Sequence, residues 1–283
     1  MEQQNPTEPV TPNPTKKIID RLLLLAFFYF GLAGGLYINQ QHYLYAPDTS
    51  RPDLAKSNAA DMKVIEVKTV DGLTLQGWYK PPANASKPVV IEFQGDSGNI
   101  GDRSFKARAL SKAGYGVLLA EYRGYGGNPG SPSEYGLYTD AHAYIDLLGT
   151  KGIPVKRVVF YGESLGTGVA VQMALEYPRA KALVLETPYT DLLSVDIPNP
   201  IWRAVRWVVR DRYDNAAKMD KVAMPVLVVF GDKDTVIPNA QGQRIFDLAH
   251  EPKKLEVIPG GGHNDLYNFG AGAKIISFLD HLK

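Results

Sequence analysis

Short apolar segments alternate with longer segments of mixed polarity from residue 88 to the carboxyl terminus. Continuous apolar runs of strand length are typical of a parallel sheet that is covered on both faces, and the mixed segments have the periodicity of helices. The predicted strands are Pro88–Gln94, Tyr115–Tyr122, Val155–Tyr161, Ala182–Glu186, Pro225–Phe230 and Lys254–Ile258. The predicted helices are Arg103–Ala113, Glu134–Leu148, Ser164–Tyr177, Asn239–His250 and Ala271–His281. We therefore expect one doubly wound α/β domain with a mostly parallel sheet.

Two segments depart from this alternation. Lys63–Val70 and Leu73–Lys80 flank an Asp-Gly turn and predict an antiparallel hairpin at the edge of the sheet. Residues 189–221 form an insert, in which Ile197–Arg210 has one apolar helical face and one face that carries arginines. This part of the insert is either an ordinary amphipathic surface helix, or a short lid that covers the site or meets a membrane.

An uncharged stretch runs from Leu22 to Ile38. As a helix it spans roughly 25 Å, enough for the hydrocarbon core of a bilayer. A buried core helix is a poor interpretation because the stretch is apolar on every face, and Ala33-Gly34-Gly35 is a mediocre cleavage site for a signal peptide. A signal-anchor fits better. Three basic residues lie between positions 16 and 21 and the next is Arg51, so the positive-inside rule predicts a cytoplasmic N-terminus and an extracytoplasmic domain.

The predicted organisation is a disordered tail at residues 1–17, a transmembrane anchor at 18–38, a connector at 39–61 and the α/β domain at 62–283. Among the 283 residues, 45% are apolar and 22% charged, as in ordinary globular proteins. The net charge of +1 gives no reason to expect nucleic acid as a partner. The chain has no cysteine, which excludes disulfides, zinc–thiolate sites and cysteine nucleophiles.

The candidate chemistry begins with a Gly-x-Ser-x-Gly sequence, Gly162-Glu163-Ser164-Leu165-Gly166. The motif alone is permissive, but here it follows a predicted strand and opens a predicted helix. This is the context of a nucleophile elbow, in which a strained turn presents the serine hydroxyl at the carboxyl end of the sheet. The sequence therefore predicts Ser164 as a catalytic nucleophile.

A serine hydroxyl becomes a useful nucleophile when a neighbouring base accepts its proton, and histidine titrates near neutral pH. Of the five histidines, only His263 lies in a glycine-rich loop directly after a predicted strand. It also comes last in the chain order that such a site requires. The remaining histidines lie beside the apolar stretch, inside a helix or near helix ends: His42, His142, His250 and His281.

The acid that orients the histidine should follow a strand between the serine and the histidine. The loop Gly231–Pro238 offers two candidates. Asp232 comes directly after the turn glycine, where aspartate commonly caps a loop. Asp234 lies at the crest of the loop and is the preferred acid, with Asp191 after strand Ala182–Glu186 as the alternative.

An oxyanion hole needs two backbone N–H groups that point at the developing charge. One should come from Leu165, the residue after the nucleophile, and the other from Asp96 in the loop Gln94–Gly101. A carboxylate beside a developing oxyanion is repulsive, so the side chain of Asp96 must turn away or be neutralised.

On these residues the chain resembles the α/β-hydrolase superfamily, specifically its membrane-anchored, serine-aminopeptidase-like or dipeptidyl-aminopeptidase-like proteins of the Bem type. The resemblance covers residues 64–282 and the N-terminal anchor. It implies Ser164 as nucleophile, Asp234 as acid and His263 as base, with the N–H groups of Asp96 and Leu165 at the oxyanion. The motifs that carry it are Gln94–Arg103, Glu121–Gly126, Gly130–Glu134, the elbow, Gly231–Pro238 and Gly261–Leu266. The family usually has His-Gly-Asn where this chain has Gln94-Gly95-Asp96.

The sequence thus predicts a membrane-anchored serine hydrolase that cleaves a carboxylic ester, thioester or amide of a small-molecule or acylated substrate. The chemistry requires no metal and no organic cofactor. The alternatives are an aminopeptidase-like serine peptidase and a non-catalytic binding protein on a hydrolase scaffold.

Overall fold

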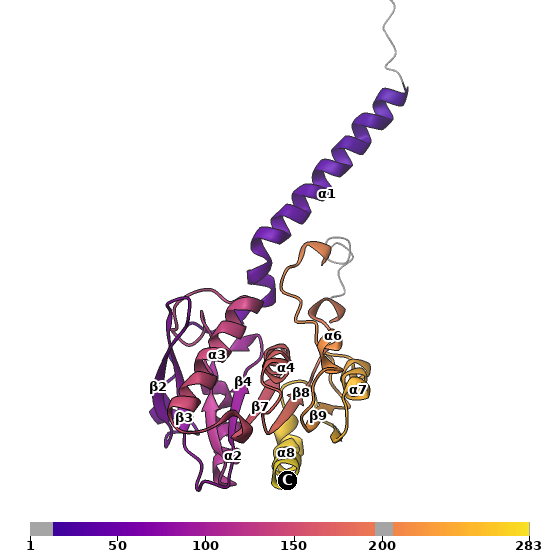
Figure 1. Ribbon diagram of the computed structural model, residues 1–283. Coiled ribbons are helices and arrows are strands. Elements are labelled where there is room, and N and C mark those ends of the chain that lie inside the picture. Colours follow the sequence, from indigo (N-terminus) through magenta and orange to yellow (C-terminus); the bar gives the residue numbers. More distant parts are fainter. Residues whose placement is uncertain (1–13, 196–205, 283) are drawn as a thin grey trace, which may run out of the picture. The chain divides into compact units, whose positions relative to one another are not determined.

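The computed structural model describes residues 14–195 and 206–282 (Figure 1). The chain divides into two units, residues 1–40 with 199–210 and residues 41–198 with 211–283. Within the described residues, the first unit holds most of helix α1 (Pro14–Leu44) and the short 3₁₀ turn η5 (Arg206–Val208). The last four residues of α1 belong to the second unit, which contains the sheet.

Helix α1 is longer at both ends than the predicted anchor at residues 18–38. It begins at Pro14, whose fixed φ suits the first turn of a helix, so residues 14–17 of the predicted tail are helical. It continues to Leu44 because nothing breaks the helix before Pro47. Large apolar side chains such as Leu23, Phe27 and Phe30 are exposed along it. The helix is long and apolar enough to cross a membrane.

An eight-stranded sheet forms the centre of the second unit, in the order β10-β9-β8-β7-β4-β6-β3-β2. The two strands β2 and β3 form an antiparallel hairpin that pairs antiparallel to β6, and all other neighbours are parallel. This topology confirms the predicted fold class. The bounds are β2 Lys63–Lys68, β3 Thr74–Lys80, β4 Val89–Phe93, β6 Gly116–Leu119, β7 Val158–Glu163, β8 Ala182–Glu186, β9 Val226–Gly231 and β10 Lys253–Ile258.

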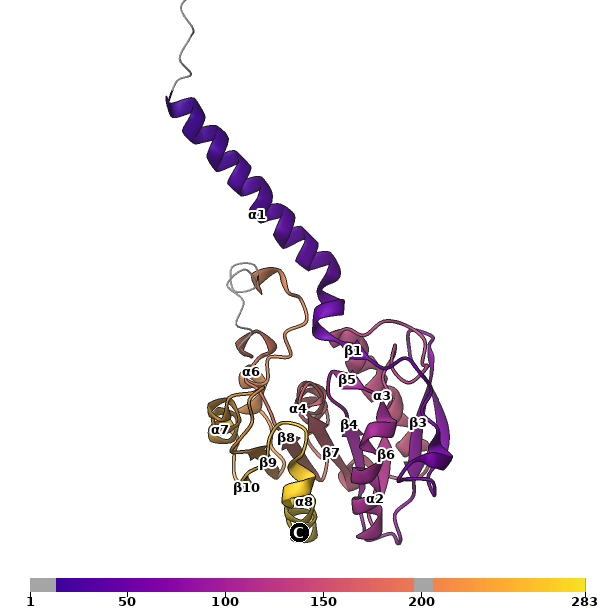
Figure 2. The same cartoon turned by 180° about the vertical axis from the view of Figure 1, so that it is seen from behind.

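Helices cover both faces of the sheet. One face carries α2 and α8, which contact each other, and the opposite face carries α3, α4 and α7 (Figures 1 and 2). Strands β4, β7, β8 and β9 are buried along their whole length between these layers, which explains their continuous apolar sequences. The bounds are α2 Ser104–Lys112, α3 Glu134–Thr150, α4 Gly166–Glu176, α6 Ala216–Met219, α7 Asn239–Leu248 and α8 Ala271–Asp280.

Several short elements differ from the expectation. Residues Val155–Arg157 form a 3₁₀ turn, η3, so the strand before the elbow begins at Val158 and not at residue 155. A two-stranded parallel pair, β1 (Ala46–Pro47) with β5 (Ser97–Gly98), is too short to leave a periodic signal in the sequence. The helix expected within residues 197–210 lies mostly outside the described residues. The other 3₁₀ turns are η1 Leu54–Lys56, η2 Ile100–Arg103, η4 Leu192–Ser194 and η6 Leu266–Phe269.

Candidate active site

Ser164 lies in the sharp turn between β7 and α4, with a φ of +49°. A positive φ is strained for a residue with a Cβ atom, and the surrounding backbone holds it there. The N–H of Ser164 donates to the carbonyl of Glu186 at 2.9 Å, and the Ser164 carbonyl accepts from the N–H and the hydroxyl of Thr167 at 2.9 and 2.6 Å. The turn is therefore fixed to the neighbouring strand β8 and to the first turn of α4.

His263 joins the serine to an aspartate. Its Nε2 lies 3.0 Å from Ser164 Oγ, and its Nδ1 lies 2.8 Å from Asp234 Oδ2. The other oxygen, Oδ1, accepts from the N–H groups of Val236 and Ile237 at 2.8 and 2.9 Å. Burial alone would raise the pKa of Asp234, but the hydrogen bond and charge of His263 outweigh it and lower the pKa. Asp234 is therefore ionised and oriented to hold the imidazole.

The other acidic candidates lie outside this chain of contacts. Asp232 accepts from the N–H of Gly260 at 2.7 Å, the loop-capping role expected for it. Asp191 accepts from the N–H of Ser194 at 3.0 Å and begins the turn η4. Three of the remaining histidines bond elsewhere: His142 to Tyr177 and Glu176, His250 to the Asp220 carbonyl and His281 to the Ser277 carbonyl.

A cavity of about 280 Å³ opens over the hydroxyl of Ser164. Its wall contains His263 and both predicted oxyanion residues, Asp96 and Leu165. The remaining lining is mainly apolar and aromatic, which suits the acyl part of a substrate. It comprises Tyr43, Leu44, Ser97, Tyr189, Leu192, Val195, Val236, Ile237 and Asn264.

Hydrogen bonds to the Asp96 carbonyl and to the buried carboxyl group of Glu121 fix the loop that carries Asp96. The Asp96 carbonyl accepts from the Tyr125 hydroxyl at 2.7 Å and from the Ala46 N–H at 2.9 Å. Glu121 accepts from the Gln94 side-chain amide at 2.7 Å and from the Ile100 N–H at 3.1 Å. Gln94 thus occupies the position of the family's usual histidine as a hydrogen-bond donor to Glu121.

Two carboxyl groups around this loop have raised pKa values. Burial raises the pKa of Glu121 to about 8, against the opposing effect of its two hydrogen bonds. The carboxyl of Asp96 opens to the cavity, yet the surrounding protein desolvates it and raises its pKa, while its own N–H and His263 oppose the shift. Asp96 is therefore more readily neutralised than an ordinary aspartate.

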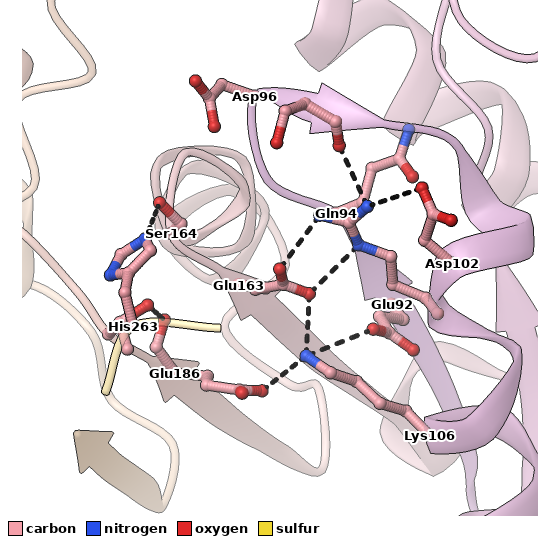
Figure 3. A network of polar contacts seen from close by, with 12 residues as sticks. Glu92, Gln94, Asp96, Asp102, Lys106, Glu163, Ser164, Glu186 and His263 are labelled. Atoms are coloured by element: carbon pink, nitrogen blue, oxygen red, sulfur yellow. Dashed lines mark hydrogen bonds and ion pairs between the residues drawn. The ribbon is translucent and has the colours of Figure 1, made fainter. Parts of the chain in front are cut away.

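Behind the elbow lies a buried charge network that the sequence did not predict (Figure 3). Lys106 on α2 donates to Glu163 and to Glu186, each at 2.7 Å, and lies 3.7 Å from Glu92. Arg103 contacts the opposite side of Glu163 at 3.0 Å. A signal was available: the apolar strands β4, β7 and β8 each carry one glutamate at or next to the carboxyl end, and these strands are neighbours in the sheet.

The surroundings of the network move the pKa values of Glu163 and Glu92 in opposite directions. Burial would raise the pKa of Glu163, but Lys106 and Arg103 outweigh it and lower the pKa to about 2. Burial raises the pKa of Glu92 to about 8, since Lys106 compensates it only in part. Neither oxygen of Glu92 has a hydrogen-bond partner among the residues that the structure describes. At neutral pH the two cations therefore face an ionised Glu163 and a Glu92 that is mainly protonated.

A known protein family matches part of the domain. The family described as "Serine aminopeptidase, S33" matches residues 85–218. An uncharacterized protein of Mycobacterium tuberculosis (strain H37Rv) is 38% identical over 247 residues, which cover 86% of this chain and 86% of that protein. Protein bem46 of Schizosaccharomyces pombe is 32% identical over 248 residues, which cover 82% of each. Alpha/beta hydrolase domain-containing protein 17B of Xenopus laevis is 30% identical and covers 70% of this chain and 66% of its own length.

Solved structures show the same fold at low sequence identity. Pyrococcus furiosus esterase Pf2001 superimposes with a TM-score of 0.67 at 19% identity, over 84% of this chain and 99% of the esterase. The esterase domain of a Rhodothermus marinus protein has a TM-score of 0.57 at 17% identity, over 77% of this chain and 96% of that domain. At this identity the likeness concerns the fold.

Proposed function

This chain is a hydrolase of the α/β-hydrolase superfamily, and we propose that it cleaves a carboxylic ester, thioester or amide through an acyl-enzyme on Ser164. The observation that carries the proposal is the continuous series of contacts from Ser164 Oγ through His263 to Asp234, at 3.0 and 2.8 Å. It is centred on the one strained residue of the elbow and opens into the cavity.

In the proposed mechanism, His263 Nε2 takes the proton of Ser164 as Oγ attacks the carbonyl carbon of the substrate. Asp234 accepts a hydrogen bond from Nδ1–H of His263 and stabilises the imidazolium that forms. Collapse of the tetrahedral intermediate transfers the proton from Nε2 to the leaving alcohol, thiol or amine, and leaves the acyl group on Oγ. Water then attacks the acyl-enzyme with His263 again as base, which releases the carboxylic acid and restores the serine.

The N–H groups of Leu165 and Asp96 are the proposed oxyanion donors. Leu165 comes directly before α4, so its N–H lies at the positive end of that helix. Asp96 lines the same cavity on a loop fixed by Tyr125 and Ala46. Each donor of such a pair stabilises a tetrahedral oxyanion by on the order of 3 kcal/mol.

Attachment to a membrane through α1 is part of the proposal. The length of α1, its exposed apolar side chains and the basic residues near its amino end support a single-pass anchor with a cytoplasmic N-terminus. Resistance of the full chain to alkaline carbonate extraction is expected. A reporter fused to the carboxyl terminus should be active outside the cytoplasm, and activity inside it would reverse the assigned orientation.

Peptidase activity is the second candidate, because the matched family is described as a serine aminopeptidase. Esterase and peptidase chemistry share the acyl-enzyme and differ in the leaving group. Nitrophenyl esters, thioesters and aminoacyl nitroanilides should therefore be compared on the same preparation. A higher kcat/KM for aminoacyl nitroanilides than for esters would favour the peptidase.

Labelling by a fluorophosphonate probe tests the nucleophile directly. The wild type should be labelled, Ser164→Ala should not be, and Ser86→Ala should be labelled like the wild type because Ser86 lies in an exposed turn. Labelling that persists in Ser164→Ala would refute the assignment. A folded wild type that is neither labelled nor active on any of these substrates would instead indicate a binding protein on a hydrolase scaffold.

A further inference from the structure

The segment that follows the apolar stretch of α1 pairs with the loop that carries Asp96. The strand β1 lies parallel to β5, with Ala46 opposite Ser97 and Pro47 opposite Gly98. The N–H of Ala46 donates to the Asp96 carbonyl and the N–H of Asp48 to the Gly98 carbonyl, both at 2.9 Å. The backbone of this segment therefore holds both ends of the three residues from Asp96 to Gly98.

Contacts on the other side fix this segment to the domain. The hydroxyl of Tyr45 donates to Asp211 Oδ2 at 2.7 Å and lies 2.9 Å from the hydroxyl of Tyr213. The Asp48 carbonyl accepts from the N–H of Gly126 at 2.8 Å. Tyr45 is buried, so its ring adds apolar packing to these polar contacts. The segment is part of the folded domain and not a loose connector.

Two side chains of the same segment reach the catalytic cavity. Tyr43 and Leu44 line it together with Ser164, Leu165 and His263. Leu44 is buried, whereas Tyr43 is exposed and contributes to the open side of the wall. The leucine side chain and the tyrosine ring beside the nucleophile offer apolar surface to an acyl chain. The tyrosine hydroxyl is the one group of these two side chains that can form a hydrogen bond with a polar leaving group.

We propose that residues 43–48, which comprise the last two residues of the N-terminal helix and the four that follow, are an active-site element with two tasks. Leu44 and Tyr43 form part of the wall that binds the acyl group of an ester or thioester, and β1 positions the oxyanion loop. This inference rests on the proposed function, because an acyl wall requires a working nucleophile beside it. The N-terminal helix is then a determinant of substrate choice as well as an anchor.

The size and position of the cavity specify the substrate class further. Its volume of about 280 Å³ lies just below the usual range for small-molecule sites, about 300–1,000 Å³, which favours a short acyl group. Tyr43 follows Ile38 by five residues, at most about 17 Å of extended chain. With the apolar stretch in a bilayer, the wall residue Tyr43 lies within that distance of the end of the stretch, where acyl esters of membrane-bound molecules are accessible.

Acyl-chain selectivity of the full chain in detergent tests the wall. Nitrophenyl esters of increasing acyl length should be hydrolysed by the wild type, Leu44→Trp and Leu44→Ala. We expect Leu44→Trp to lower kcat/KM for the longer esters by about 10-fold and spare acetate, and Leu44→Ala to shift the optimum toward longer chains. Val70→Trp and Val70→Ala are the matched controls, since Val70 lies exposed in the β2–β3 turn.

Ala46→Pro tests the positioning of the oxyanion loop. Proline removes the N–H that donates to the Asp96 carbonyl, whereas Ala46→Val keeps it. We expect Ala46→Pro to lower kcat by about 10-fold or more with little change in KM, because the loop would present its donor less accurately. Should Ala46→Pro fail to fold, Tyr45→Phe removes the hydroxyl contacts of the segment and is expected to lower kcat in the same way.

The outcomes separate this inference from the proposed function. A labelled, active wild type whose chain-length profile is the same in both Leu44 variants would overturn the acyl wall. An Ala46→Pro variant that folds with the kcat of Ala46→Val would overturn the positioning role. A wild type that is neither labelled nor active would contradict the proposed function itself.

Discussion

Arg103 and Glu163 form a buried bidentate ion pair, with Nη2 3.0 Å from Oε1 and Nε 3.3 Å from Oε2. The third arm of the guanidinium, Nη1, donates to the Ser97 carbonyl at 2.9 Å. Glu163 directly precedes Ser164, and Ser97 directly follows Asp96. Arg103 therefore connects the nucleophile elbow with the oxyanion loop, on the side opposite β1.

Arg103→Lys should lower kcat by about 10-fold to 100-fold with little change in KM, because an ammonium cannot donate to both partners in fixed geometry. Steady-state kinetics with a nitrophenyl ester and the melting temperature provide the measurement. Arg108→Lys is the matched control, since Arg108 lies exposed on α2, the helix that directly follows Arg103. An unchanged kcat in a variant with a lowered melting temperature would reduce Arg103 to a purely structural role.

Glu92→Gln should stabilise the protein, and increasingly so as the pH rises from 5 to 8. The pKa of Glu92 is raised by burial to about 8, so the folded protein keeps a proton that the unfolded chain releases above its ordinary pKa of 4.5. The stability from this group is present below about pH 4.5, is lost progressively as the pH rises, and the loss is complete once the pH has passed about 8. Glutamine has nearly the same shape and no charge to desolvate.

Thermal unfolding of both proteins across this pH range measures the effect. The difference in melting temperature should grow to several degrees at pH 8. Glu66→Gln, at an exposed position on β2, should keep the pH profile of the parent. A difference that is independent of pH would mean that Glu92 does not change ionisation over this range.

Asp96→Asn should be at least as active as the parent at pH 7 to 8. An ionised carboxylate on the cavity wall opposes the negative charge of the tetrahedral intermediate, so its removal should raise kcat by up to about 10-fold. Since burial raises the pKa of Asp96, the advantage of the variant should shrink as the pH is lowered. Asp247→Asn, on the exposed face of α7, controls for loss of one charge. A large loss of activity in Asp96→Asn would give the carboxylate a positive role.

Much of the fold and the candidate site residues could be predicted from local sequence. Ser164, Asp234 and His263 each lie in a loop or turn that follows a predicted strand, so their positions at the carboxyl edge of the sheet could be predicted one by one. The choice between Asp232 and Asp234 depended on which carboxylate faces the imidazole. That relation belongs to the tertiary structure, although the crest of the loop indicated Asp234.

Other features could not be predicted because they depend on which segments of the chain become neighbours in the folded protein. Glu92, Glu163 and Glu186 lie in three separate strands, and only the order β8-β7-β4 brings them around one lysine. The two-residue strand β1 has no periodicity, so its pairing with the oxyanion loop left no signal. The end of α1 was predicted from apolarity at Ile38, whereas the helix continues through polar residues to Leu44 because they are compatible with helical backbone.

Gly166→Ala should destabilise the domain and abolish labelling of Ser164, because the first turn of α4 passes very close to β4. A Cβ on Gly166 would lie 2.0 Å from the Phe93 carbonyl oxygen and 2.5 Å from that of Gln94, both of them backbone atoms. The strand or the helix must therefore shift. Overpacking of this kind costs about 1–3 kcal/mol or more, and about 2–4 °C of melting temperature for each kcal/mol in a domain of this size.

Gly149→Ala is the matched control for this substitution. Gly149 lies in α3, and a Cβ there meets nothing within 4 Å. Alanine has the higher helix propensity, so this variant should be as stable as the parent or more stable by up to about 1 kcal/mol, with full labelling. Melting curves and fluorophosphonate labelling of the two variants should thus diverge. Equal stability and equal labelling would mean that the close approach of α4 to the end of β4 does not constrain the elbow.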